Sequence, residues 1–121
     1  MPSGVSKFLL QDILIDKWNF DGYITSNCGA VNGIFKSLKY VKTTEEAAAV
    51  ALKAGMNLNC GSTFNFLKKV VEEGLVSEDL IDTITKQLFK TRFKLGMFDA
   101  TDTNPFSEIG SENITEKNIS I

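Results

Sequence analysis

The chain has 121 residues, of which 43% are hydrophobic and only two are prolines, so its composition excludes disorder and allows one small domain rather than two. Its 13 basic and 15 acidic residues give a net charge of −2 with no long block of either sign. We therefore expect no nucleic-acid partner, and no membrane partner because no apolar run approaches the roughly 18 residues that a spanning helix needs.

The chain contains no histidine and two cysteines, Cys28 and Cys60. Histidine is the commonest metal ligand and the commonest proton shuttle at neutral pH, and a zinc site needs at least three protein ligands. We therefore expect no metal site, and any catalysis must use carboxylates or thiols. The two cysteines are expected to be small buried side chains, with a disulfide as the alternative.

Helix and strand signals alternate in the first part of the chain. Apolar residues at helical spacing predict a helix over residues 6–18, with Ser6 as its N-cap. Residues 19–22 break that helix, and the uncharged run 23–26 is typical of a short strand. A loop is expected from residue 27 to about residue 42.

A second series of the same signals follows. Thr43 and Glu46 have the spacing of a capping box, which predicts a helix that runs through the alanine-rich residues 47–54 and ends at Gly55. Residues 56–59 read as a second short strand. Two more helices are predicted, one over 64–73 and one from Ser77 to Gly96, whose buried side is expected to carry Leu80, Ile81, Ile84, Leu88 and Leu95.

The sequence Asn-Cys-Gly ends both strand-like runs, at residues 27–29 and 59–61. Two strands joined by a helical crossover are expected to be parallel, so both corners should lie on one face. The predicted fold class is α/β, and such a face is where (β/α)8 barrels keep their chemistry. Because two parallel strands cannot bury both of their faces, the predicted architecture is a partial barrel, incomplete as an independent domain.

The pattern changes after Asp99, where threonine, aspartate, asparagine and serine replace the periodic apolar residues. We place a boundary there. Residues 1–99 are predicted to form the domain portion, and residues 100–121 a linker or tail toward a second domain.

Several runs, taken in order, resemble glycoside hydrolase family 3: residues 8–14, 18–23, 26–30, 45–49, 51–55, 58–61 and 91–98. The Leu58-Asn59-Cys60-Gly61 run is closest to the β-xylosidase and β-glucosidase-like members. The resemblance implies the C-terminal part of the family's (β/α)8 TIM barrel domain, that is, its last two βα units.

The resemblance also implies a chemistry. Family members are retaining, exo-acting enzymes that use two carboxyl groups and no cofactor on β-linked oligosaccharides or aryl glycosides, and they are often secreted or periplasmic. Their nucleophile is the aspartate of a Ser-Asp-Cys-Gly-Ala motif, which matches Asn27 here. The first four residues lack the pattern of a secretory signal, so the compartment of this chain is left open.

A neutral amide is a far poorer nucleophile than a carboxylate, so the chain is expected to be inactive by itself. The family's general acid/base lies outside the matched runs. Ser26, Cys28 and Asn59 are the candidate substrate-binding residues beside Asn27. Structural readings stay open, because Asn27 and Asn59 could simply be turn residues at strand ends.

Two other functions are alternatives to the hydrolase. One is a carbohydrate-binding remnant that recognises sugar without chemistry. The other is a structural fragment, which would self-associate through exposed strand faces.

Overall fold

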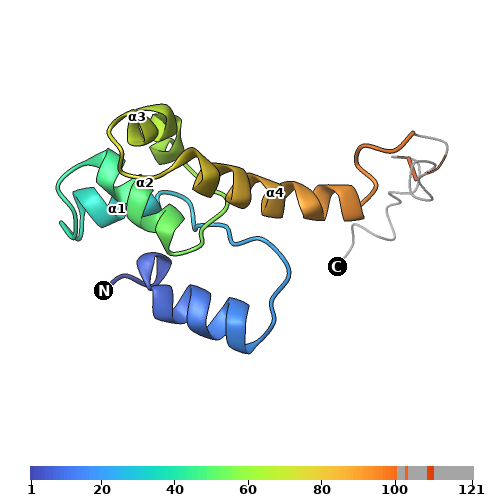
Figure 1. Ribbon diagram of the computed structural model, residues 1–121, viewed down its shortest axis with the longest axis horizontal. Coiled ribbons are helices and arrows are strands. Elements are labelled where there is room, and N and C mark those ends of the chain that lie inside the picture. The colour runs from blue at the N-terminus through green and yellow to red at the C-terminus, as the bar shows by residue number, and fades with distance from the viewer. Residues whose placement is uncertain (101–102, 104–108, 111–121) are drawn as a thin grey trace, which may run out of the picture. The chain divides into compact units, whose positions relative to one another are not determined.

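The computed structural model describes residues 1–100, 103 and 109–110. Its elements, in order, are η1 (Ser3–Val5), η2 (Phe8–Lys17), α1 (Ala30–Lys36), α2 (Thr44–Lys53), η3 (Thr63–Phe66), α3 (Leu67–Glu72) and α4 (Glu78–Lys94) (Figure 1). The chain divides into two units, Met1–Thr91 and Arg92–Ile121, and each is considered by itself. Within the described ranges, every helix is too short or too polar to cross a membrane.

The predicted fold class is wrong. The described residues are helical and contain no named strand, so a partial (β/α)8 TIM barrel of two βα units is not what the chain forms. The two strand-like runs meet at one isolated parallel bridge, between Thr25 and Leu58. Stable sheets need three or more strands, and each of these runs has only one short neighbour among the described residues.

The predicted helix starts are confirmed at atomic level. Thr43 Oγ1 accepts a hydrogen bond from the Glu46 N–H at 3.1 Å, which caps α2. Ser77 Oγ accepts from the Leu80 N–H at 3.3 Å at the start of α4. Ser6 Oγ likewise accepts from the Leu9 N–H at 3.3 Å, just ahead of η2. Local side-chain chemistry therefore fixed these three starts.

The loop predicted over residues 27–42 is wrong in part, because α1 lies inside it. Val31 and Ile34 are buried at a helical spacing of three, a signal that the glycines at positions 29 and 33 concealed. Gly29 has a φ of +77°, a left-handed conformation that glycine adopts freely, and it turns the chain from the bridge into α1.

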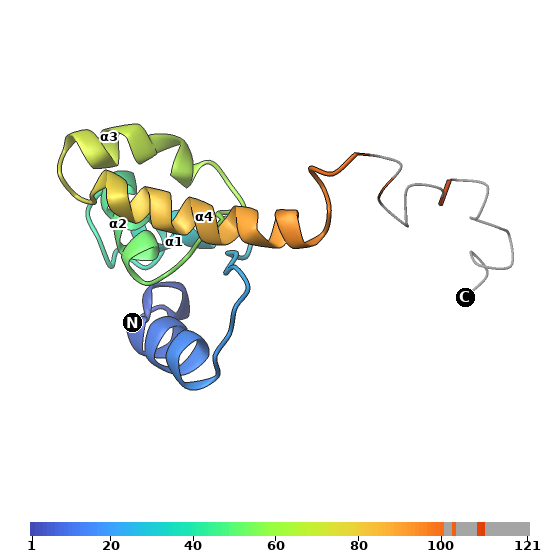
Figure 2. The same ribbon diagram turned by 45° about the vertical axis from the view of Figure 1, so that its right-hand side comes forward.

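Helix α2 is the centre of the packing, with α1 and α3 beside it (Figures 1 and 2). A hydrophobic cluster lies on each side of α2. Ala47 and Ala51 face one cluster, while Ala48, Ala49 and Leu52 face the other. The buried members from outside α2 are Val5, Val31, Ile34 and Met56 in the first cluster and Val70, Val76 and Ile84 in the second. Small alanine side chains let the neighbouring segments approach α2 closely.

Several large apolar side chains reach the surface. Leu95, predicted to lie on the buried side of the last helix, is 64% exposed. Trp18, at the end of η2, is 68% exposed.

The predicted boundary after Asp99 is untested, since most of the predicted tail (100–121) lies outside the described residues.

One ion pair joins α2 to α3. Lys69 Nζ lies 2.6 Å from Glu45 Oε1, and the Glu45 residue is buried. The hydrogen bond from Lys69 lowers the pKa of the Glu45 carboxyl below its ordinary value, and the same contact raises the pKa of the Lys69 ammonium. The pair therefore stabilises the fold in its doubly charged form.

The folded-state pKa of Glu45 lies below the unfolded value, so its stabilisation is complete above about pH 4.5 and is lost as the pH falls through the folded pKa. The contribution of Lys69 is lost only as the pH rises above about 10.5. We predict that Glu45→Gln destabilises the fold at pH 7 and flattens the loss of stability between pH 5 and about pH 3, measured by urea unfolding. Glu72→Gln is the control, because Glu72 pairs with Lys68 in solvent and its loss should change little.

Candidate functional site

The Thr25–Leu58 bridge is the centre of a short parallel ladder. The Leu58 N–H donates to Ile24 O at 3.0 Å, and the Ser26 N–H donates to Leu58 O at 2.9 Å. Further along, the Gly29 N–H donates to Cys60 O at 2.8 Å. Residues 24–29 therefore lie against residues 57–60 in the same direction, which places the two Asn-Cys-Gly corners next to each other.

Ser26 joins the corners through its side chain. Its hydroxyl oxygen accepts from the Cys60 N–H at 2.9 Å, and the hydroxyl donates to Asn59 Oδ1 at 3.2 Å. Ser26 is 8% exposed. Both hydrogen-bonding capacities of the hydroxyl are used inside the protein, which leaves little for an external ligand.

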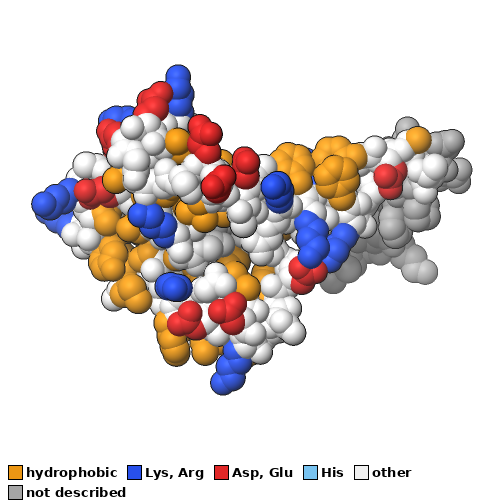
Figure 3. All heavy atoms as spheres, viewed as in Figure 1, with side chains coloured by type: hydrophobic (Ala, Val, Ile, Leu, Met, Phe, Trp, Pro, Cys, Tyr) orange, Lys and Arg blue, Asp and Glu red, His pale blue; other side chains and the backbone are white. Residues whose placement is uncertain are grey.

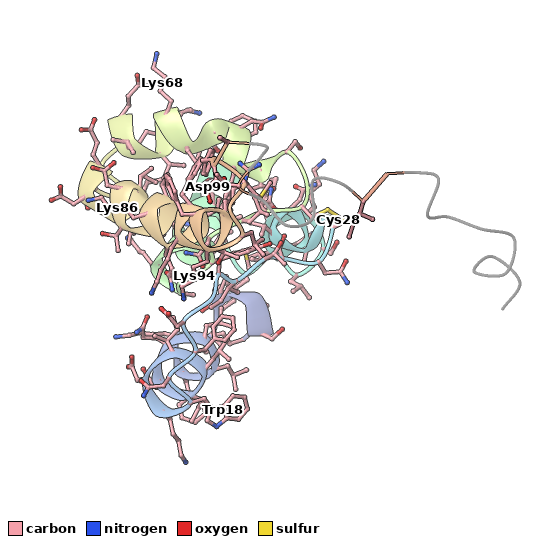
Figure 4. The ribbon with its side chains drawn as sticks, turned by 90° about the vertical axis from the view of Figure 1, so that its right-hand side faces the viewer. Trp18, Cys28, Lys68, Lys86, Lys94 and Asp99 are labelled. Carbon is pink, nitrogen blue, oxygen red and sulfur yellow. A yellow bond between two sulfur atoms is a disulfide. The ribbon has the colours of Figure 1, made fainter. Side chains whose placement is uncertain are left out.

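Cys28 and Cys60 form a disulfide, with Cα atoms 4.3 Å apart (Figure 4). The expectation that both are small buried side chains is wrong, since Cys28 is exposed and Cys60 is only half-buried. The alternative of a disulfide is confirmed. It joins residues 32 positions apart at the point where the ladder ends.

Asn27 lies between Ser26, which is hydrogen-bonded to Asn59 and Cys60, and Cys28, which forms the disulfide. Its carbonyl accepts from the Ala30 N–H at 3.1 Å, and the residue is exposed. In the described part of the chain, no hydrogen bond holds its side-chain amide. The backbone of residue 27 is thus fixed through Ser26, Cys28 and Gly29, while its side chain is available to a ligand.

A groove of about 260 Å³ opens beside Asn27. Its lining residues are Ser3, Gly4, Leu9, Leu10, Ile24, Thr25, Ser26, Asn27, Ala30 and Met56. The structure thus brings two of the candidate site residues to the groove, Ser26 and Asn27, whereas Cys28 and Asn59 are not among its lining residues. None of the described residues that line it is an aspartate or a glutamate.

Asn59 has one buried polar atom without a partner. Its Nδ2 makes no hydrogen bond to any described residue, although its Oδ1 accepts from Ser26.

Among the described residues, no group of three or more cysteine, aspartate or glutamate side chains is placed to hold a metal ion.

Asn57 is a residue that the sequence analysis missed. It is 5% exposed, and its Oδ1 accepts from the Ile24 N–H at 2.8 Å. Its Nδ2 donates to Ile84 O at 3.2 Å and to Gln87 Oε1 at 2.9 Å. Asn57 therefore ties the start of the ladder to α4. The available signal was the alternation of Asn57 and Asn59 with Met56 and Leu58, which puts two amide side chains into one short run.

Gln87 completes this connection. Its Nε2 donates to Gly22 O at 3.1 Å, so α4 holds the chain immediately before the ladder. An ion pair between Lys90 and Asp21 adds a second contact from the same helix.

We predict that replacing both cysteines with serine lowers the free energy of unfolding by about 3 to 4 kcal/mol, because the disulfide restricts a loop of this length in the unfolded chain. Guanidinium unfolding of the oxidised wild type and the double variant measures the difference. Amide hydrogen exchange should rise first at Gly29 and Cys60, whose N–H groups are bonded at this corner. Unchanged exchange there would show that the hydrogen bonds alone hold the corner.

We predict that Asn57→Ala destabilises the fold by about 2 to 3 kcal/mol, because it leaves the half-buried Ile24 N–H without its acceptor and removes both side-chain hydrogen bonds from Asn57 to α4. Gln87→Ala is the matched control and should cost about 1 kcal/mol, since it removes a less buried side chain. Equal costs in thermal or urea unfolding would contradict a special role for Asn57.

Comparison with known proteins identifies the family. Residues 1–90 match the Glycosyl hydrolase family 3 N terminal domain. The chain is 36% identical over 118 residues to a probable exo-1,4-beta-xylosidase of Neosartorya fischeri, covering 94% of this chain and 15% of that protein. It is 39% identical over 116 residues to the probable beta-D-xylosidase 6 of Arabidopsis thaliana, covering 94% of this chain and 14% of the relative. The chain belongs to glycosyl hydrolase family 3.

Solved structures give the same result. The chain superposes on a GH3 exo-beta-xylosidase, solved in complex with a xylobiose aziridine activity based probe, with a TM-score of 0.86 and 28% identity over 93% of this chain and 15% of that one. A beta-glucosidase of Listeria innocua, in complex with isofagomine, gives a TM-score of 0.82 at 28% identity over 100% of this chain and 16% of that one. The chain therefore spans about one sixth or less of these relatives.

Proposed function

We propose that this chain is the nucleophile-bearing part of a retaining, exo-acting glycoside hydrolase of the β-xylosidase or β-glucosidase type, with Asn27 at the position of the nucleophile. The observation that supports it best is that residue 27 is fixed from both sides at the edge of a groove, within a Ser-Asn-Cys-Gly-Ala run. From the order of the motifs we infer that the chain corresponds to the C-terminal part of the family's N-terminal domain.

The proposed chemistry explains why the chain would not act by itself. In a retaining enzyme one carboxylate attacks the anomeric carbon, a second carboxylic acid protonates the leaving oxygen, and water then releases the sugar. Asn27 offers a neutral amide with no charge to stabilise an oxocarbenium-like transition state. The groove supplies no carboxylate among its described lining residues.

The other candidate residues take different roles in this proposal. Ser26, Cys28 and Asn59 position residue 27 rather than bind sugar directly. The Ser26 hydroxyl is hydrogen-bonded to Asn59 and Cys60, and the Cys28 sulfur is bonded to the Cys60 sulfur. Of Ser26, Cys28 and Asn59, only Asn59 has a side-chain amide. Its buried Nδ2 has no hydrogen-bond partner among the described residues.

The test is a chimera in which this chain replaces the matched 118-residue stretch of the Neosartorya fischeri protein. We expect the chimera to leave aryl β-xylosides intact and its Asn27→Asp variant to hydrolyse them at least about 100-fold faster, because a charged nucleophile is restored. Asn59→Asp in the same chimera is the control and should not raise turnover. A folded Asn27→Asp chimera without hydrolysis would contradict the proposal.

Carbohydrate binding without hydrolysis is the second candidate. The exposed Asn27 amide beside the groove supports it, since an amide can donate to and accept from sugar hydroxyls. Calorimetry of the chain against xylose, glucose and their β-linked oligomers is the measurement. Saturable binding that Asn27→Ala abolishes would favour this function over the hydrolase.

A further inference from the structure

Three lysines surround a hollow at the surface of the loop between α1 and α2. The hollow has a volume of about 510 Å³ and is lined by Phe35, Lys36, Lys39, Val41 and Lys42. We propose that this cationic hollow binds an anionic oligosaccharide, that is, a β-linked sugar chain with carboxylate-bearing units. The sugar part of this assignment rests on the proposed function, whereas the preference for an anion rests on the lysines themselves.

The acidic residues that follow the loop do not neutralise its lysines. Glu45 Oε1 lies 2.6 Å from Lys69 Nζ, and Glu46 Oε2 accepts from the backbone N–H of Lys42 at 2.7 Å. None of the three lysine ammonium groups forms an ion pair with a residue that the structure describes. Because the whole chain has a net charge of −2, this short segment is a local exception with cations available to an anionic ligand.

The backbone conformation at Lys39 does not favour a lysine. Its φ is +48°, in the left-handed region that glycine adopts with the least strain. The Leu38 N–H donates to Gly33 O at 2.9 Å. The Tyr40 N–H donates to Ile34 O at 2.9 Å, so hydrogen bonds hold the backbone on both sides of residue 39. A glycine would therefore fit this turn better than the lysine that occupies it.

The position of Lys42 is also unfavourable for the helix that it precedes. Lys42 comes directly before Thr43, the N-cap of α2, and the N-terminal end of a helix carries a partial positive charge that repels a cation. Lys36, in contrast, lies in the last turn of α1, where a cation is favourable. Two of the three lysines thus occupy positions that local structure disfavours, which is typical of residues kept for a function.

The cationic hollow also offers apolar surface to a sugar ring. Phe35 and Val41 line it, and Tyr40 of the same loop is 48% exposed. Figure 3 shows Lys or Arg side chains at the surface where the loop between α1 and α2 lies in Figure 1, with hydrophobic side chains nearby. Ligand sites commonly combine an apolar and aromatic lining with a few polar groups that fix orientation, and an ammonium group bonds a carboxylate more strongly than a neutral hydroxyl.

The cationic hollow shares no lining residue with the groove beside Asn27. It also contains none of the candidate site residues. The proposed site therefore holds an acidic sugar chain and performs no chemistry on it.

The test is an NMR titration of the ¹⁵N-labelled chain with a β-1,4-linked xylo-oligosaccharide that carries a glucuronic acid unit. We expect the backbone amides of residues 35–42 to shift, with weaker or no binding of the neutral oligosaccharide of the same length. Raising the NaCl concentration from about 50 mM to about 500 mM should weaken the binding several-fold, because salt screens exposed ion pairs.

Two triple variants separate the cationic hollow from charge in general. Binding should weaken about tenfold or more when the lysines of the hollow are replaced together, as Lys36→Gln, Lys39→Gln and Lys42→Gln. The matched control removes the same charge from exposed lysines of η2, α2 and α4, as Lys17→Gln, Lys53→Gln and Lys86→Gln, and should change binding by less than about twofold.

A single variant tests whether Lys39 is kept for binding rather than for the fold. Lys39→Gly should raise the melting temperature, because glycine relieves the left-handed conformation, and should weaken binding of the acidic oligosaccharide at the same time. A lysine with only a structural role would not give this combination.

Three results would overturn the inference. Equal binding of the neutral oligosaccharide at residues 35–42 would remove the preference for anions. Equal or tighter binding of inorganic triphosphate at the same residues would make the hollow a general anion site and not a carbohydrate site. Shifts confined to residues 24–30 would assign the ligand to the groove. The chimera reads hydrolysis and the titration reads the place of binding, so an inactive Asn27→Asp chimera would contradict the proposed function without moving the shifts at residues 35–42.

Discussion

The pairing of residues 24–29 with residues 57–60 is the constraint on which the first unit depends. Four backbone hydrogen bonds, the Ser26 hydroxyl and a disulfide join two segments whose paired residues are 31 to 34 positions apart in the chain. Everything between them, including α1 and α2, must fold back within that span. Asn57 extends the same constraint to α4 through its side-chain hydrogen bonds to Ile84 O and Gln87 Oε1.

At Asn27 the contacts that fix the backbone are separate from the side chain that faces the groove. The backbone on both sides of the residue is fixed by contacts that do not involve its side chain. Asparagine and aspartate have nearly the same shape and differ in charge and in hydrogen-bond donors. In the proposed function, an asparagine at position 27 therefore lacks the charge that a retaining mechanism needs, while the contacts that fix its backbone are kept.

The packing around α2 is dense but small. Alanines form most of the contribution of α2 to both clusters, and large side chains such as Phe8 and Trp18 stay at the surface. The chain thus buries small side chains around α2 and exposes several large aromatic ones. It belongs to glycosyl hydrolase family 3 and spans about 15% of the xylosidase relatives that it matches.

The sequence by itself determined the local features: the caps at Thr43 and Ser77, the two Asn-Cys-Gly corners and the family motif around Asn27. These depend on residues within a few positions of each other, or on a pattern shared with relatives. Only the tertiary structure decided the rest: the helical α1, the disulfide, the role of Asn57 and the reduction of two predicted strands to a single bridge. Strand formation and disulfide pairing depend on which distant segments become neighbours, and that is set by packing rather than by local propensity.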